Sequence, residues 1–129
     1  DEELGVGESN KHEVVGNLYW MVHALECVIE NSFKIALTQR EPKLELASRV
    51  NETRFIIEVA HPGQIQKNAI ETLFELDDAN SEDAGLAVAH YIMEQQGGEV
   101  LLVESGAAGE WVRLEVHFPC DYPLENSVV

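Results

Sequence analysis

Two pairs of histidine and cysteine are the residues in this sequence whose types and spacing could bind a metal. His23 and Cys27 are four residues apart, so on a helix they share one face and could bind a transition metal. His117 and Cys120 form a second pair. A protein zinc site needs about three or four side-chain ligands, so two ligands favour a core histidine beside a buried thiol. The sequence contains no Ser-His-Asp, P-loop or paired-carboxylate pattern.

The composition indicates one compact, strongly acidic domain. The chain has 129 residues, 45% of them hydrophobic, and its net charge is −16, with 24 acidic residues against 8 Lys and Arg. This charge disfavours nucleic acid and anionic lipid, which attract basic patches, and it opposes ATP unless Mg²⁺ and local donors offset it. We interpret the acidity as a solubility feature. No apolar run approaches the ~20 residues needed to cross a bilayer, so we expect no membrane insertion.

The cysteine content and the first residues bear on location. Cys27 and Cys120 are the only two cysteines, which is too few for a disulfide scaffold and indicates a reducing, cytoplasmic setting. The opening DEELGVGESN is acidic and polar, unlike a secretory signal. Because the sequence lacks an initiator Met, we expect a fragment of a longer protein.

Hydrophobic periodicity predicts one long helix and two strands in the first half. The helix is expected over residues 13–38, ending at Glu41-Pro42, and the strands over 43–50 and 54–59. Asn51-Glu52 is the expected turn between the strands, and His61-Pro62-Gly63 the break after them. The apolar residues expected on the buried face of the helix are Leu18, Val22, Leu25, Ile29 and Phe33.

The second half predicts two helices and a hairpin. A short helix over 66–76 is followed by an acidic loop over 77–83, a helix over 84–96 with Gly97-Gly98 as its cap, and strands over 100–104 and 111–118. In the last strand, Val112, Leu114, Val116 and Phe118 share one face, and Pro119 is expected to end it. The order of elements predicts an α+β fold, a two-layer sandwich whose mixed sheet is covered on one face by helices. The expected layout is a flexible acidic lead-in at 1–12, one domain at 13–119 and a tail at 120–129.

Four segments in this order resemble the signatures of one ATP-binding fold. They are ENSFKIA at 30–36, VAHPGQI at 59–65, TLFE at 72–75 and GLAVAHYIMEQQGG at 85–98. The chain resembles, over roughly residues 14–118, the ATP-binding catalytic domain of sensor histidine kinases, in the superfamily shared with gyrase and MutL. The resemblance implies the Bergerat-type two-layer fold.

The first segment resembles the N box of that family. The resemblance implies that Asn31 holds Mg²⁺ and that Lys34 faces phosphate. The position four residues before the Asn, which is Asn or Glu in the family, is Cys27 here, and a thiol is a poor substitute for an oxygen ligand of a hard cation. From the residues alone, Asn31 could equally be a polar helix residue facing a groove and Lys34 a solvated lysine.

The second segment departs from the family's D-x-G-x-G-I pattern. Aligned on Ile65, the adenine-binding Asp is replaced by Ala60, and the two glycines by Pro62 and Gln64, with Gly63 out of register. A site that loses such a polar partner loses on the order of 1–3 kcal/mol of binding free energy.

The last two segments resemble the F box and the lid of the family. Phe74 lies nine residues after Ile65, at the family's spacing. Gly85 and Leu86 match the G-x-G-L-A pattern, with Asp83 in place of its first glycine, and a carboxylate there would repel phosphate. Gly85 could equally begin the helix at a tight turn. The cofactor-binding residues that the resemblance implies are Asn31, Lys34, Ala60, Gly63, Ile65, Gly85 and Leu86.

Three functional hypotheses follow. The first is a domain like the catalytic domain of histidine kinases, with an eroded nucleotide site that binds Mg·ATP weakly or not at all. No catalytic residue is assigned to it. Its partners would be a phosphoacceptor helical hairpin, a response regulator or a partner kinase. The second is an active divergent kinase or ATPase, in which Glu58 or a neighbour replaces the lost Asp and the γ-phosphoryl passes to a His outside this chain. The third is an unrelated α+β interaction domain. Trp20 and Trp111 are candidates for an exposed docking patch.

Overall fold

The computed structural model describes residues 13–65, 73–75, 84–106 and 111–121. The predicted lead-in, the acidic loop, and most of the predicted short helix, hairpin turn and tail lie outside these residues. In chain order, the elements are β1 (Glu13–Val14), α2 (Leu18–Leu37), β2 (Glu45–Asn51), β3 (Arg54–Pro62), α4 (Ala84–Gln95), β4 (Glu99–Ser105) and β5 (Trp111–Asp121).

Strand β5 is the central strand of a five-stranded sheet. On one side it pairs along most of its length with β3, which pairs in turn with the edge strand β2. On its other side β5 pairs with β4 and, near its C-terminal end, with β1. Every pairing among the described strands is antiparallel, so the parallel pairs implied by the predicted mixed sheet are not seen there.

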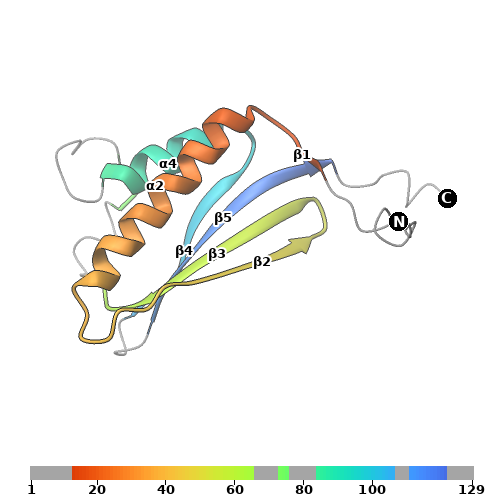
Figure 1. The fold of residues 1–129 in the computed structure, drawn as a ribbon. Coiled ribbons are helices and arrows are strands. Elements are labelled where there is room, and N and C mark those ends of the chain that lie inside the picture. Colours follow the sequence, from red (N-terminus) through yellow and green to blue (C-terminus); the bar gives the residue numbers. More distant parts are fainter. Residues whose placement is uncertain (1–12, 66–72, 76–83, 107–110, 122–129) are drawn as a thin grey trace.

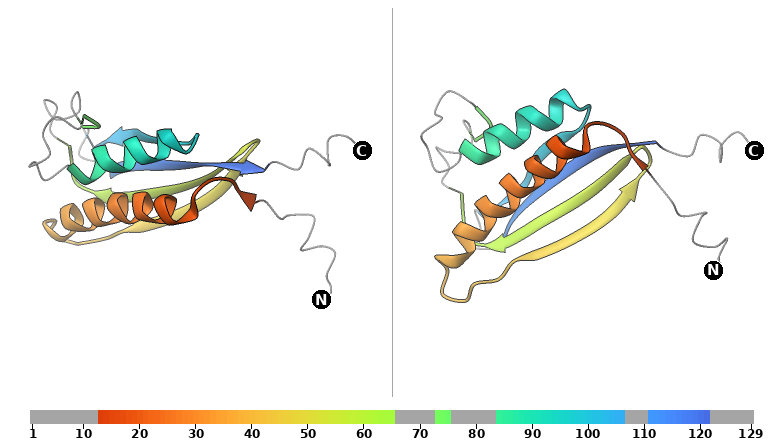
Figure 2. Two further views of the ribbon diagram at one scale, coloured as in Figure 1. Left: turned by 90° about the horizontal axis from the view of Figure 1, so that it is seen from above. Right: turned by 45° about the horizontal axis from the view of Figure 1, so that its top comes forward.

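Both described long helices cover the same face of the sheet, which confirms the predicted two-layer α+β architecture. Figure 1 shows α2 and α4 side by side on one side of the strands, and the view from above in Figure 2 shows both helices in front of the sheet. Side chains alternate between the two faces of a strand. The buried core between the layers includes Met21, Val28, Val59, Leu86, Met93, Val112, Leu114, Val116 and Phe118, so the predicted inner face of the last strand is confirmed.

Helix α2 begins later than the sequence predicts. Residues 13 and 14 form strand β1, whose Glu13 and Val14 pair with the end of β5, and the expectation of helix from residue 13 is wrong. Asn17 is the N-cap: its side chain accepts a hydrogen bond of 3.3 Å from the backbone N–H of Trp20. Gly16 just before it has φ +141, a conformation that favours glycine. The polar cap and this glycine therefore stop the helix from extending backwards.

The face of α2 expected to be buried is largely the wrong one. Leu18, Val22 and Phe33 are exposed, with 68%, 45% and 51% of their surface accessible. The buried residues of the helix are Met21, Ala24, Val28, Asn31, Ser32 and Ala36. Three of these, Ala24, Ser32 and Ala36, have small side chains. The helix therefore buries a face with several small residues and leaves larger apolar side chains on its outer face.

Helix α4 and its cap agree with the prediction. The helix covers Ala84–Gln95. Gly97 has φ +87, and the N–H of Gly98 donates to the carbonyl of Met93 at 2.7 Å, which is the hydrogen bond of a Schellman cap. A Cβ atom added at Gly98 would overlap the backbone carbonyl oxygen of His117, so the chain passes too close to β5 there for a side chain.

Two predicted strand ends are too early. Strand β3 continues through His61 to Pro62, and the break falls at Gly63, with φ +129. Strand β5 continues through Pro119 to Asp121, because the carbonyl of Pro119 accepts from the N–H of Val15 at 2.8 Å and the N–H of Cys120 donates to Thr53 at 2.9 Å. Proline lacks a donor but keeps its acceptor, so it remains in the strand. The predicted turn at Asn51-Glu52 is confirmed, with Glu52 at φ 53.

Candidate functional site

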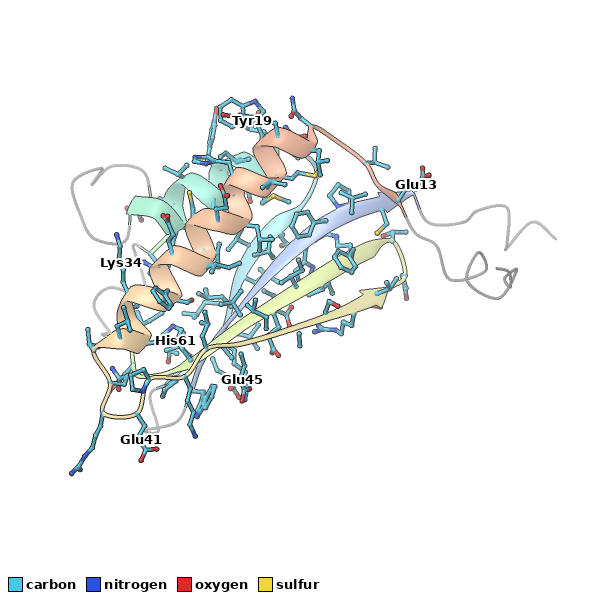
Figure 3. All side chains as sticks on the ribbon, in the orientation of Figure 1. Glu13, Tyr19, Lys34, Glu41, Glu45 and His61 are labelled. Carbon is cyan, nitrogen blue, oxygen red and sulfur yellow. The ribbon has the colours of Figure 1, made fainter. Side chains whose placement is uncertain are left out.

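The residues of the N-box-like segment lie on the second half of α2. Asn31 is 7% exposed and Ser32 is fully buried, so both turn inward. Lys34 is exposed, and Figure 3 shows it pointing away from the sheet toward the surface. Asn31 and Ser32 therefore each place a side-chain oxygen, the atom type that a Mg²⁺ ion prefers, on the buried side of the helix.

Gly85 is brought directly onto α2, next to the turn that carries Asn31. A Cβ atom added at Gly85 would lie 3.6 Å from the carbonyl oxygen of Cys27 and 3.8 Å from its Cβ. Cys27 precedes Asn31 by one helical turn. Leu86 is fully buried in the core. The first and fourth motif-like segments therefore meet, and the residue between them is a half-buried cysteine.

The end of β3 presents His61, not Ala60, to the helices. Ala60 pairs with Arg113 and shares the outer face of the sheet with Glu58, which approaches Arg113 at 3.7 Å. His61 pairs with Val112 of the core, and paired residues share one face. In the resemblance described above, the position of the family's Asp aligns with Ala60. In the fold, its neighbour His61 occupies the inward position between β3 and α2, as Figure 3 shows.

His61 is a fully buried, neutral histidine. It is 0% exposed, and burial lowers its pKa, a shift only partly offset by a hydrogen bond to the Pro62 carbonyl. Its Nδ1 lies 2.9 Å from that carbonyl oxygen. Since a carbonyl only accepts, Nδ1 carries the proton and Nε2 is left as an acceptor. Among the described residues, Nε2 has no hydrogen-bond partner.

Gly63 and Ile65 lie at the far end of α2 from Gly85. A Cβ atom at Gly63 would be 3.4 Å from Cγ2 of Ile35. Ile65 is buried in the core, and its N–H donates to the carbonyl of Ser105 at 2.9 Å. Because Ile35 lies eight residues after Cys27, the two contact points are separated by about 12 Å along the helix. Gly85 and Gly63 therefore lie against α2 at two separate points, and Asn31 lies between these points in the helix sequence.

The described part of this site offers little positive charge. Burial raises the pKa of the Cys27 thiol, and the neighbouring carboxylates of Glu30 and Glu26 raise it further. The thiol therefore stays protonated near neutral pH and is not a thiolate ligand. Lys34 is the one cation in the second half of α2, and it is exposed. The local field opposes an anionic ligand.

The F-box-like residue Phe74 packs against α4. Its ring stacks on His90 with centroids 4.8 Å apart and planes at 14°, and Nε2 of His90 lies 3.3 Å from Glu94. Leu73 is buried in the core. Sequence reasoning missed the role of His90, although its position one helical turn after Leu86 places it on the same side of α4.

Neither histidine–cysteine pair gains a third ligand from the described residues. His23 Nε2 and Cys27 Sγ are 3.9 Å apart, but the His23 side chain is exposed, so the expected core histidine is wrong. His117 and Cys120 lie on opposite faces of β5, since they are three positions apart in the strand. No group of three or more His, Cys, Asp or Glu side chains within the described ranges could hold a metal ion. Nor is any helix there long and apolar enough to cross a membrane.

A charged cluster on the helix-free face of the sheet was missed in the sequence. Arg49 donates to Glu115 at 3.0 Å, and Nε2 of His117 lies 2.8 Å from Glu115. Arg54 donates to Glu99 at 2.7 Å and approaches Nδ1 of His117 at 3.3 Å. These residues come from all four long strands, so only the strand register could have revealed them. Because their charges are paired, we interpret the cluster as a structural network. It lies on the same face of the sheet as Ile56, which is almost fully buried.

Solved structures share this fold. The chain matches the Acinetobacter baumannii histidine kinase AdeS with a TM-score of 0.59 and 17% sequence identity, over 80% of this chain and 47% of that one. It matches the catalytic domain of histidine kinase ThkA with a TM-score of 0.63 and 17% identity, over 82% of this chain and 70% of that one. No protein-family model and no curated protein matches the sequence.

These comparisons establish the fold. It is that of histidine kinase catalytic domains, as the four motif-like segments predicted, and the order of helices and strands leaves no support for an unrelated α+β fold. The chain spans about half the length of the AdeS structure that it matches.

Proposed function

We propose that this chain is a cytoplasmic two-component signalling domain with the histidine kinase catalytic fold and an eroded nucleotide site. In this proposal it binds Mg·ATP weakly or not at all and acts by recognising another protein. Candidate partners are a phosphoacceptor helical hairpin, a response regulator or a partner kinase.

The observation that carries the proposal is the contact between Gly85 and Cys27. The fold brings the N-box-like and lid-like segments together, and the α2 residue against Gly85 is a protonated thiol. Mg·ATP carries a net negative charge, and Glu26 and Glu30 lie exposed on the same helix. A nucleotide there would gain one amide ligand from Asn31 and meet an acidic field.

Calorimetric titration of ATP and ADP, each with Mg²⁺, tests the proposal. We expect no binding tighter than about 1 mM, equivalent to about −4 kcal/mol. A micromolar dissociation constant would overturn it.

The alternative, an active divergent kinase domain, is favoured by one feature, the buried acceptor of His61. Its Nε2 could accept a hydrogen bond from the adenine amino group, as the lost carboxylate would. If micromolar ATP binding is found, His61→Ala should weaken it by about tenfold or more. The matched variant His90→Ala, on α4, should leave it unchanged, and equal effects of both would exclude this route to adenine.

A further inference from the structure

An aromatic surface lies at the opposite end of the helix layer from His61. Tyr19, Trp20 and Tyr91 are 73%, 45% and 53% exposed, although large aromatic side chains are usually covered. The Tyr19 and Trp20 rings meet edge to face with centroids 5.3 Å apart. Figure 3 shows Tyr19 at the N-terminal end of α2, projecting outward from the helix layer. Trp111 does not join this surface, because it lies by the C-terminal end of α2 with Gln39 and Arg40.

Between the two helices, this surface is hollowed. A pocket of about 220 Å³ is lined by Trp20 from the first turn of α2 and by Tyr91, Ile92, Gln95 and Gln96 from the end of α4. It is smaller than the roughly 300–1,000 Å³ of typical small-molecule sites, and its size and apolar walls suit one bulky side chain. A hydrogen bond joins the two helices beside the pocket: the side-chain oxygen of Gln96, just after α4, accepts from the N–H of Asn17, the N-cap of α2, at 2.7 Å.

Both helices that form the pocket also carry an exposed acidic side chain. Glu26 lies exposed on α2, linked to Trp20 through His23, whose ring centroid is 6.1 Å from the indole. Glu94 lies exposed on α4, one turn beyond Tyr91. The sequence has no Lys or Arg between residues 12 and 33 or between 84 and 112. Nothing on these helical turns therefore offsets the negative charge.

We propose that Trp20 and Tyr91 form a docking site for a basic amphipathic helix of a partner protein, which inserts one large apolar side chain between α2 and α4. Its Lys or Arg residues flank the apolar stripe and meet Glu26 on one side and Glu94 on the other. Exposed Trp and Tyr side chains around a pocket are the usual anchors of protein interfaces. Two other occupants fit less well, since a second copy carries the same −16 charge and that net charge also repels an anionic membrane.

This inference names the partner chemistry for the proposed recognition role, and its test does not involve nucleotide. The probe is a synthetic 18-residue helix with Leu at every third and fourth position and Lys elsewhere. Two peptides serve as controls. One has the same composition in a scrambled order that gives no apolar stripe, and the other keeps the stripe but has Glu in place of every Lys. The variant Trp111→Phe leaves Trp20 as the single indole, so its fluorescence reports binding at this surface. We expect saturable binding of the striped Lys peptide alone, weakening with salt.

Point variants then locate the site. Trp20→Ala and Tyr91→Ala, followed by calorimetry, should each weaken binding by about tenfold or more. Phe33→Ala removes an equally exposed aromatic from the far end of the same helix and should change nothing. Glu26→Gln with Glu94→Gln should weaken binding and flatten its salt dependence.

Four results would overturn the proposal. They are equal binding of the scrambled peptide, equal loss in Phe33→Ala, a dimer of the free protein that Trp20→Ala dissociates, and binding to phosphatidylserine vesicles. None of them bears on ATP affinity, and ATP binding would leave this inference intact.

Discussion

Arg49 on β2 donates a 3.0 Å hydrogen bond to the carboxylate of Glu115 on β5, across the intervening strand β3. The Glu115 side chain is only 11% exposed. Burial alone would raise the pKa of this carboxyl, but hydrogen bonds from His117 and Arg49, with the charges of both, lower it overall. The pair therefore makes the stability of the sheet depend on pH.

The dependence has a definite sign. A carboxyl with a lowered pKa in the folded state stabilises the protein above its unfolded value, near 4.5, and that contribution is lost as the pH falls through the folded pKa. We expect Glu115→Gln to lower the free energy of unfolding by about 1–3 kcal/mol at pH 7, and by much less near pH 3. Urea unfolding at both pH values measures this. Glu104→Gln, which removes an exposed partner of Arg113, should cost less than about 1 kcal/mol; equal losses in the two variants would contradict the account.

His61 predicts a second pH effect, in a higher range. Burial lowers its pKa from 6.5, so below about pH 6.5 the unfolded chain binds a proton that the folded chain excludes, and stability falls. We expect His61→Gln to reduce the loss of stability between pH 7.5 and pH 5.5, whatever its effect on absolute stability. The control is His23→Gln, in which the replaced ring is exposed. If His61→Gln loses as much stability between pH 7.5 and pH 5.5 as the starting protein, His61 must accept a proton in the folded state.

The two apolar faces of α2 predict a contrast between neighbouring residues. Met21 is 1% exposed and lies in the core, whereas Leu18 lies on the outer face. Met21→Ala should lower the free energy of unfolding by about 2–5 kcal/mol, and Leu18→Ala by no more than about 0.5 kcal/mol. Chemical denaturation of both variants tests the assignment of the faces. A larger loss of stability in Leu18→Ala than in Met21→Ala would instead support the helix orientation that the sequence predicts.

This contrast shows how much of the fold could be predicted and why the rest could not. Segments with a clear period and a clear stop, such as α4 with its Gly97-Gly98 cap and the inner face of β5, were predicted correctly. The face of α2 was not, because both sides are apolar and the buried side includes small residues such as Ala24. Strand β1 is too short for any periodicity, and its pairing with β5 depends on residues far away in the chain.

The candidate site was predictable only in part for the same reason. The meeting of the Asn31 and Gly85 segments follows from the order of motifs. Which residue of β3 turns inward depends on strand register, and a shift of one residue exchanges the faces. Alignment on Ile65 selected Ala60, whereas the strand register turns the neighbouring His61 toward the core. The cluster around Glu115 depends on register across four strands.

The cap of α4 predicts a stability difference between adjacent glycines. Gly97 needs a positive φ but has room for a side chain, since its nearest neighbour to a Cβ is Pro119 at 3.9 Å. Gly97→Ala should cost about 1–2 kcal/mol, and Gly97→Asn less. At Gly98 a Cβ would overlap the carbonyl of His117, so Gly98→Ala should cost about 3 kcal/mol. Thermal unfolding of the three variants gives the order, and a milder effect at Gly98 than at Gly97 would show that α4 and β5 can separate there.

Cys27 provides a direct test of the proposal that the nucleotide site is weak. Its Cβ and carbonyl oxygen are the α2 atoms closest to the open side of Gly85, and its raised pKa keeps it a neutral thiol. An amide oxygen at this position would add a hard ligand beside Asn31 without adding charge. We therefore expect Cys27→Asn to raise the Mg²⁺-dependent affinity for ATP by about tenfold, measured by calorimetry with and without Mg²⁺. Cys120→Ser, which replaces the other cysteine at the far end of β5, should have no effect. If folded Cys27→Asn binds ATP no better than the starting protein, the residue at position 27 does not limit the affinity, and the proposal that this position weakens the site is wrong.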